Sequence, residues 1–248
     1  MTDAITWLGH ASVLIESGGV RLLTDPVFRD RIGPLLRIAP EGGVGLPGRV
    51  DCVLLSHLHA DHLDLPSLRD VAGLARVVTP YPSGAWLERR GVGDVHEIRP
   101  GEEVGVGGVR VLATPALHDR RRYPLGPAAD PVGYLVSGAR PVYFAGDTDL
   151  FEAMAELRGR VAVALLPVWG WGPRLGPGHL DPERAAKAAA LIAPEVAIPI
   201  HWGTFVSRLP GGRMADPTLP AREFVRFAGR YAPSVKIRVP APGERVEL

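Results

Sequence analysis

The chain has 248 residues, of which 46% are hydrophobic and 22% are charged, a composition typical of a globular protein and unlike that of a disordered tail. Its 28 basic and 27 acidic residues leave a net charge of +1, which argues against a nucleic-acid-binding protein, because such proteins carry a basic excess. The single cysteine excludes an intrachain disulfide and a cysteine-rich zinc motif.

The first part of the chain is predicted to consist mainly of strands. Short apolar runs predict a strand meander at residues 5–8, 13–15 and 20–23. The Gly/Pro-rich segment 33–48 is too long for a simple turn, so we expect an ordered surface loop there, with a lid as one role for it. A buried strand is then expected at residues 51–56, and it leads directly into a group of histidines.

From residue 67 onward, strands are predicted to alternate with helices. Helices are expected at residues 67–71, 83–90, 150–157, 182–192 and 219–231. Strands are expected at residues 77–78, 95–98, 103–106, 109–113, 133–136, 142–145, 161–166, 196–200 and 235–239. No composition break or internal repeat divides the chain, so we predict one domain over residues 1–248 in which two sheets lie between layers of helices.

The sequence shows neither a secretion signal nor a membrane-spanning segment. The N-terminus has no basic region followed by an apolar run, and no stretch approaches the roughly 18 apolar residues that cross a bilayer. We therefore expect a cytoplasmic protein without a transmembrane segment. The sequence leaves the oligomeric state open, a homo-oligomer included, and it leaves peripheral membrane contact open as well.

The predicted strand 51–56 is followed at once by His57, His59, Asp61 and His62. Imidazole and carboxylate groups are the natural ligands of zinc and its first-row neighbours. His57 and His59 are two residues apart, so on extended backbone they point the same way. Asp61 and His62 are adjacent and point differently, which would suit a second ion. Because buried ionisable groups need partners, this cluster predicts a metal site.

Further candidate ligands follow other predicted strands. His118, Asp147 and His201 each lie just past the C-terminal end of a strand. A site assembled from strand-end loops requires this position. The sequence therefore predicts that these three residues join the first cluster.

This set of residues resembles the metallo-β-lactamase superfamily of hydrolases. Residues 57–62 match its His-x-His-x-Asp-His signature, and His118, Gly146-Asp147-Thr148 and His201-Trp202-Gly203-Thr204 match its later ligand positions in order. The resemblance covers nearly the whole chain and implies an α/β fold, the four-layer αββα sandwich, with metals at the edge between the sheets. It also implies that His57, His59 and His118 hold one metal ion, that Asp61, His62 and His201 hold another, and that Asp147 bridges them.

Four further segments resemble one branch of that superfamily, namely residues 7–12, 23–28, 179–183 and 200–205. The branch contains N-acylphosphatidylethanolamine-hydrolysing phospholipase D and ascorbate-6-phosphate lactonase, and the phospholipase motifs are the closer match. The segment after His118 departs from the phospholipase pattern. The resemblance thus implies hydrolysis of a phosphodiester first, with a lactone or another carboxylic ester as the alternative.

The implied cofactors are two divalent metal ions, zinc first, with manganese or iron as alternatives. Such a pair lowers the pKa of a shared water, so that hydroxide can attack an ester near neutral pH. A positively charged centre favours a small anionic ester or phosphodiester as substrate. Asp61 would orient the hydroxide. His179 would contact the developing oxyanion or protonate the leaving group.

Other residues are candidates for supporting roles. His10 and Asp25 lie near strand ends and could orient ligand imidazoles. Arg121, Trp169 and Trp171 are candidate substrate contacts. Two other classes stay open: a di-iron redox protein of the same fold, which metal identity would distinguish, and a non-catalytic metal-binding protein. The non-catalytic class is disfavoured because every expected ligand position is filled.

Overall fold

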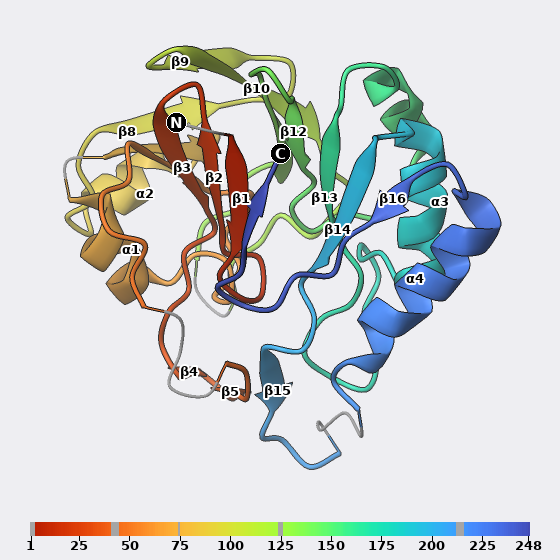
Figure 1. Cartoon of the computed structure of the whole chain (residues 1–248). Coiled ribbons are helices and arrows are strands. Elements are labelled where there is room, and N and C mark those ends of the chain that lie inside the picture. The colour runs from red at the N-terminus through yellow and green to blue at the C-terminus, as the bar shows by residue number, and fades with distance from the viewer. Residues whose placement is uncertain (1–2, 41–44, 74, 124–125, 212–215) are drawn as a thin grey trace.

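The computed structural model describes residues 3–40, 45–73, 75–123, 126–211 and 216–248. Two seven-stranded sheets pack face to face, and helices cover their outer sides (Figure 1). The predicted αββα sandwich is therefore confirmed. Each sheet is antiparallel in one part and parallel in the other.

The first sheet contains the N-terminal meander and the strand that precedes the histidine cluster. Its strands, in spatial order, are β17 (Arg245–Glu247), β1 (Ala4–Trp7), β2 (Val13–Ser17), β3 (Val20–Thr24), β6 (Cys52–Leu54), β7 (Arg76–Pro80) and β8 (Val95–Ile98). The strands from β3 to β8 run parallel. Their crossover connections carry the helices α1 (Leu65–Ala72) and α2 (Gly84–Glu88), which lie on the outer face of this sheet (Figure 1).

The second sheet is built in the same way from later parts of the chain. Its strands, in spatial order, are β16 (Lys236–Ile237), β14 (Val196–Ile200), β13 (Val163–Pro167), β12 (Val142–Phe144), β11 (Val132–Val136), β10 (Val109–Pro115) and β9 (Glu103–Val106). Its outer face is covered by the 3-10 helix η1 (Glu152–Leu157) and by α3 (Pro182–Ile192) and α4 (Leu219–Tyr231). The strands from β12 to β16 run parallel, so their carboxyl ends share one edge.

Apolar side chains fill the space between the layers. The core between the two sheets includes the fully buried Ile5, Leu54, Tyr134, Phe144 and Ile198. Two further cores lie under the helices, one beneath α1 and α2 and one beneath α3 and α4. Burial of this much apolar surface holds both sheets in place, and with them the loops at their edges.

A small third sheet corrects the expectation for residues 33–48. Instead of a loop alone, β5 (Leu35–Arg37) pairs with β15 (Phe205–Ser207) and with β4 (Arg31–Ile32). Residues 41–44 of the expected loop lie outside the described residues. Val27, Ile32, Leu35 and Phe205 form a separate apolar cluster here. Strand β5 escaped prediction because its longer pairing, with β15, joins residues far apart in the sequence.

Several helix and strand boundaries also differ from the prediction. Helix α1 begins earlier than residue 67, because the Asp64 side chain accepts a hydrogen bond from the Ser67 backbone N–H and so caps the first turn. The helix expected at 150–157 is a 3-10 helix that begins at Glu152. None of the helices in the described ranges is long and apolar enough to cross a bilayer.

The final strand of the prediction is also wrong in part. Within 235–239 only Lys236–Ile237 form a strand, and β17 follows later in the chain. Strand β17 is short and mostly polar, so its sequence gives little signal. Its pairing with β1, in which Ile5 lies opposite Val246, places it at the sheet edge.

The only cysteine, Cys52, should be unreactive in the folded protein. It lies on β6 with no exposed surface, and burial raises the pKa of its thiol from 9.0 to about 12. Because the thiolate is the reactive form, a thiol reagent should label it only after unfolding. Raising the pH from 9 towards 12 should favour unfolding, since the unfolded thiol loses its proton first. Rapid labelling of the folded protein near neutral pH would contradict this.

Candidate metal centre

The seven sequence-predicted ligands meet at one edge of the sandwich. His57, His59, Asp61 and His62 follow β6, whereas His118, Asp147 and His201 follow β10, β12 and β14 of the other sheet. Together with His10, Asp25 and His179 they form four overlapping groups, in each of which the ligand atoms lie within 4.8 Å of one another. The groups are His57, His59 and His118; His10, Asp61, His62 and His201; Asp25, His57 and His62; and His118, Asp147 and His179. The structure therefore brings together side chains that are far apart in the sequence.

The first group includes a ring nitrogen with a lone pair, on His118, and a buried ring nitrogen without a partner among the described residues, on His57. His118 Nδ1 donates to the Gly178 carbonyl at 2.7 Å, which leaves a lone pair on Nε2, 3.0 Å from His59 Nδ1. Burial lowers the pKa of His118 to about 4, so its ring is neutral. His57 Nδ1 lies 3.0 Å from the Ser56 hydroxyl, and its buried Nε2 has no partner among the described residues.

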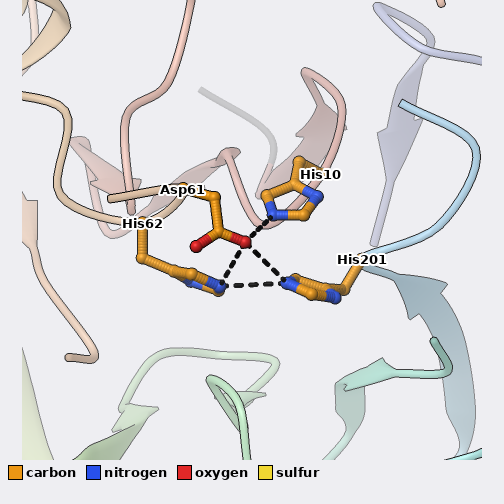
Figure 2. A group of neighbouring side chains, drawn as sticks. All are labelled: His10, Asp61, His62 and His201. Carbon is orange, nitrogen blue, oxygen red and sulfur yellow. Dashed lines mark hydrogen bonds and ion pairs between the residues drawn. The ribbon is translucent and has the colours of Figure 1, made fainter. Parts of the chain in front are cut away.

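The second group also contains two histidine nitrogens that face each other (Figure 2). His62 Nδ1 donates to Asp25 Oδ2 at 2.7 Å, and His201 Nδ1 donates to the Trp169 carbonyl at 2.7 Å. Both Nε2 atoms thus carry lone pairs, yet they face each other at 2.9 Å. Two facing lone pairs repel unless a cation lies between them. That cation is a proton or a metal ion.

The charges around His62 and His201 agree with this geometry. Burial lowers the pKa of His201 far below its ordinary value. Burial also lowers that of His62, but the charge of Asp147 and its hydrogen bond outweigh burial and hold the pKa of His62 well above 6.5. In the metal-free protein the proton therefore belongs on His62. A divalent ion fits the same place, since both nitrogens are natural ligands.

Asp147 lies between the two groups. Its Oδ2 is 3.3 Å from Nε2 of both His62 and His201, and 4.0 Å from His118 Nε2. Its Oδ1 is buried with no hydrogen-bond partner among the described residues. Burial raises the pKa of Asp147, but the histidine charges and hydrogen bonds outweigh it and hold this pKa well below 3.8. The side chain is therefore an ionised carboxylate that reaches both groups.

Asp61 enters the second group from the solvent side. Its Oδ2 lies 3.1 Å from His10 Nε2 and 3.9 Å from Nε2 of both His62 and His201 (Figure 2). The same oxygen lies 3.1 Å from Trp171 Nε1. The indole N–H donates to this oxygen. Two donors therefore fix one carboxylate oxygen beside the facing histidines.

Asp25 and His10 lie behind the candidate ligands. Asp25 Oδ2 accepts from His62 Nδ1 and from the Ser56 hydroxyl, and Oδ1 accepts from the Ser56 backbone N–H. The His10 ring lies against that of His201, with centroids 3.9 Å apart. His10, Asp25 and His201 all adopt positive φ values, of 52°, 35° and 63°. Such conformations cost energy and persist where packing enforces them.

The candidate substrate contacts are placed unequally. His179 Nε2 lies 3.5 Å from Asp147 Oδ2, and the side chain is 23% exposed, so it borders both the centre and solvent. Trp171 is 37% exposed beside Asp61. Trp169 is partly buried, and its indole N–H donates to the Gly172 carbonyl. The exposed Arg121 side chain makes no hydrogen bond or ion pair with any described residue of the cluster.

Sequence reasoning missed several groups that hold the candidate ligands in place. Two of them are the carbonyls of Gly178 and Trp169, which leave no mark in a sequence because every residue has a carbonyl. Ser56 could have been found, since it directly precedes His57 and its hydroxyl donates to Asp25. The Arg122 side chain lies under the cluster loop, where Nη1 donates to the carbonyls of Leu58 and Leu63.

Comparison with known proteins agrees with this geometry. The family described as Beta-lactamase superfamily domain matches residues 20–202. A UPF0173 metal-dependent hydrolase from Methanopyrus kandleri is 36% identical over 251 residues, 98% of this chain and 99% of that protein. The N-acyl-phosphatidylethanolamine-hydrolyzing phospholipase D 1 of Caenorhabditis elegans is 32% identical over 231 residues, 81% of this chain and 64% of that protein. Igni18, a metallo hydrolase from Ignicoccus hospitalis, superposes with a TM-score of 0.73 at 28% identity, over 100% of this chain and 99% of that chain.

Proposed function

Because this chain belongs to the beta-lactamase superfamily and is a metal-dependent hydrolase, we propose that it uses two divalent metal ions to hydrolyse an ester, a phosphodiester first. The observation that carries this proposal is the pair of Nε2 atoms of His62 and His201, which face each other at 2.9 Å and need a cation between them. In the other group, His118 Nε2 lies 3.0 Å from His59 Nδ1, and His57 Nε2 has no partner among the described residues. Asp147 lies within reach of both. Two cation sites joined by one carboxylate account for all of these contacts.

The proposed ligands divide into two sets that share Asp147. His57, His59 and His118 would hold one ion, and Asp61, His62 and His201 would hold the other. Nitrogen-rich sets of this kind favour zinc, with manganese or iron as alternatives. His10 and Asp25 keep their roles as orienting residues, because each contacts a ligand side chain directly.

The proposed chemistry is attack by hydroxide on the ester. When bound, the two ions lower the pKa of a water molecule, so that hydroxide is available near neutral pH. Asp61 accepts a hydrogen bond from this nucleophile and orients it, since His10 and Trp171 hold the Asp61 carboxylate in place. His179 borders the centre and solvent, from where it donates a hydrogen bond to the developing oxyanion or a proton to the leaving group.

The choice of substrate rests on likeness and on charge. The phospholipase D of Caenorhabditis elegans supports a phosphodiester, and a centre with two divalent ions favours an anionic ester. Trp171 is the best placed of the proposed substrate contacts, because it is exposed beside Asp61. Trp169 is a weaker candidate because it is partly buried, and Arg121 is weaker because no hydrogen bond joins its exposed side chain to the described residues of the cluster. A lactone or another carboxylic ester is the alternative.

A hydrolysis assay on one metal-quantified preparation tests the proposal. The substrates are an aryl phosphodiester, an N-acylphosphatidylethanolamine and a simple lactone, each with and without added zinc or manganese. We expect two bound ions per chain, turnover of the phosphodiesters, and loss of turnover on chelation that added metal restores. Turnover of the lactone alone would favour the alternative. Failure to bind metal after reconstitution would overturn the proposal.

A further inference from the structure

Arg122 contacts the ligand loop, residues 57–63, which carries four of the proposed ligands. Its Nη1 donates to the Leu58 carbonyl at 2.6 Å and to the Leu63 carbonyl at 2.9 Å. The side chain is half-buried, and its guanidinium carbon lies 5.3 Å from the centre of the Trp86 ring. One cation thus contacts both ends of a six-residue segment.

The two carbonyls are placed where they define the shape of this loop. Leu58 and Leu63 turn their side chains into the core beneath the first sheet, whereas the ligands between them face the metal centre. Within the loop, the His59 carbonyl accepts from the backbone N–H groups of His62 and Leu63. The Leu58 and Leu63 carbonyls accept no other hydrogen bond from the described residues. Arg122 therefore satisfies two buried acceptors at once.

The backbone around Arg122 holds the side chain in position. The Arg122 N–H donates to the Pro127 carbonyl at 3.0 Å, and the Gly126 N–H donates to the Arg122 carbonyl at 2.8 Å. A Cβ atom at Gly126 would come within 2.4 Å of the Arg122 side chain. A glycine at that position leaves the space that the arginine occupies.

The two preceding arginines differ from Arg122. Arg120 forms an ion pair with Asp130 at 2.7 Å, on the exposed surface. No hydrogen bond joins the exposed Arg121 side chain to the described residues of the cluster. Of these three consecutive arginines, only Arg122 contacts the ligand loop.

We propose that Arg122 is a positioning residue that holds the ligand loop in its metal-binding conformation. The inference rests on the proposed function, because it takes His57, His59, Asp61 and His62 as ligands. Charge-assisted hydrogen bonds to both ends of the loop restrict its movement before metal arrives. A restricted loop loses less conformational entropy on binding, so the metal is bound more tightly.

The test compares the wild type with Arg122→Met, Arg122→Lys and Arg120→Met. Methionine keeps an unbranched stem without donors, and lysine keeps the charge and donors. Zinc affinity is measured by competition with a chelator. The kinetic constants kcat and KM are measured on an aryl phosphodiester, and Tm is measured on the metal-free proteins. Replacing a group that holds metal ligands in position typically lowers metal affinity by about 10- to 100-fold. We expect Arg122→Met to lose zinc affinity in that range and to have a lower kcat. Arg122→Lys should recover part of the zinc affinity and kcat, and Arg120→Met should have wild-type values of both.

Two results would overturn the inference and can be told apart from failure of the proposed function. If the wild type binds zinc and Arg122→Met binds it equally well, Arg122 does not position the loop. If Arg122→Met lowers only the Tm of the metal-free protein, its role is purely structural. Should Arg122→Met fail to fold, Arg122→Lys decides. We expect it to bind zinc more weakly than both the wild type and Arg120→Met, and wild-type zinc affinity in Arg122→Lys would overturn the inference. Absence of zinc from the wild type would overturn the proposed function and this inference with it.

Discussion

Replacing Asp147 with alanine should abolish hydrolysis and reduce metal content while leaving the fold largely intact. The Asp147 carboxylate lies 3.3 Å from Nε2 of both His62 and His201 and reaches towards His118 as well. Its removal takes away the negative charge shared by both proposed ion sites. Losing one preorganised electrostatic group costs about 10²- to 10³-fold in turnover, and we expect a loss at least that large. Metal quantification and the phosphodiester assay measure the two effects.

Asp149 provides the matched control for this substitution. It lies two residues further on, where its carboxylate pairs with Arg184 and accepts from the Leu150 N–H. Because it does not contact the cluster histidines, Asp149→Ala should keep both metal content and turnover. Wild-type turnover by Asp147→Ala with unchanged metal loading would refute the proposed role of Asp147.

Replacing Asp25 with alanine should have the largest effect on stability. Asp25 is fully buried and accepts hydrogen bonds from His62 Nδ1, the Ser56 hydroxyl and the Ser56 backbone N–H. Alanine would leave these three donors without a partner in the core. Breaking a buried charged network in this way costs about 3–5 kcal/mol. Urea unfolding of the metal-free protein measures the change in the free energy of unfolding.

An exposed ion pair supplies the comparison for Asp25. Glu103 contacts Arg110 at 3.5 Å, with both side chains largely in solvent. Exposed pairs of this kind contribute about 0–1 kcal/mol, so Glu103→Ala should change the free energy of unfolding little. Equal stability of Asp25→Ala and Glu103→Ala would show that the Asp25 carboxylate does not support His62.

The helices and strands that were predicted correctly are those whose own residues carry a signal. The structure has strands at Val95–Ile98, Glu103–Val106 and Val196–Ile200, and helices at Pro182–Ile192 and Leu219–Tyr231, as predicted. Each of these has an apolar periodicity or a capping residue of its own. Strands β5 and β17 have neither. They form because Phe205 pairs opposite Arg37 and Val246 opposite Ile5, and such distant pairings cannot be read from a short window.

The site divides in a similar way. Histidines and aspartates after strand ends were identifiable because their side chains have no structural reason to gather there. The carbonyls of Gly178 and Trp169, which fix the protons on His118 and His201, have no sequence signature. In the sequence, Arg122 is one of three consecutive arginines, and nothing distinguishes it from Arg120 and Arg121. Its contacts with Leu58 and Leu63 depend on how two distant loops pack.

The order of the proposed ligands along the chain matters while the protein is being synthesised. His62 and His201 touch in the folded protein but are 139 residues apart. At about 5–20 residues per second, a ribosome needs on the order of ten seconds to make that stretch. During this time the nascent chain already displays residues 57–62, whereas the ligands from the second sheet do not yet exist. A metal ion captured then would be held by half a site, so the metal present during translation could influence which ion the finished protein contains.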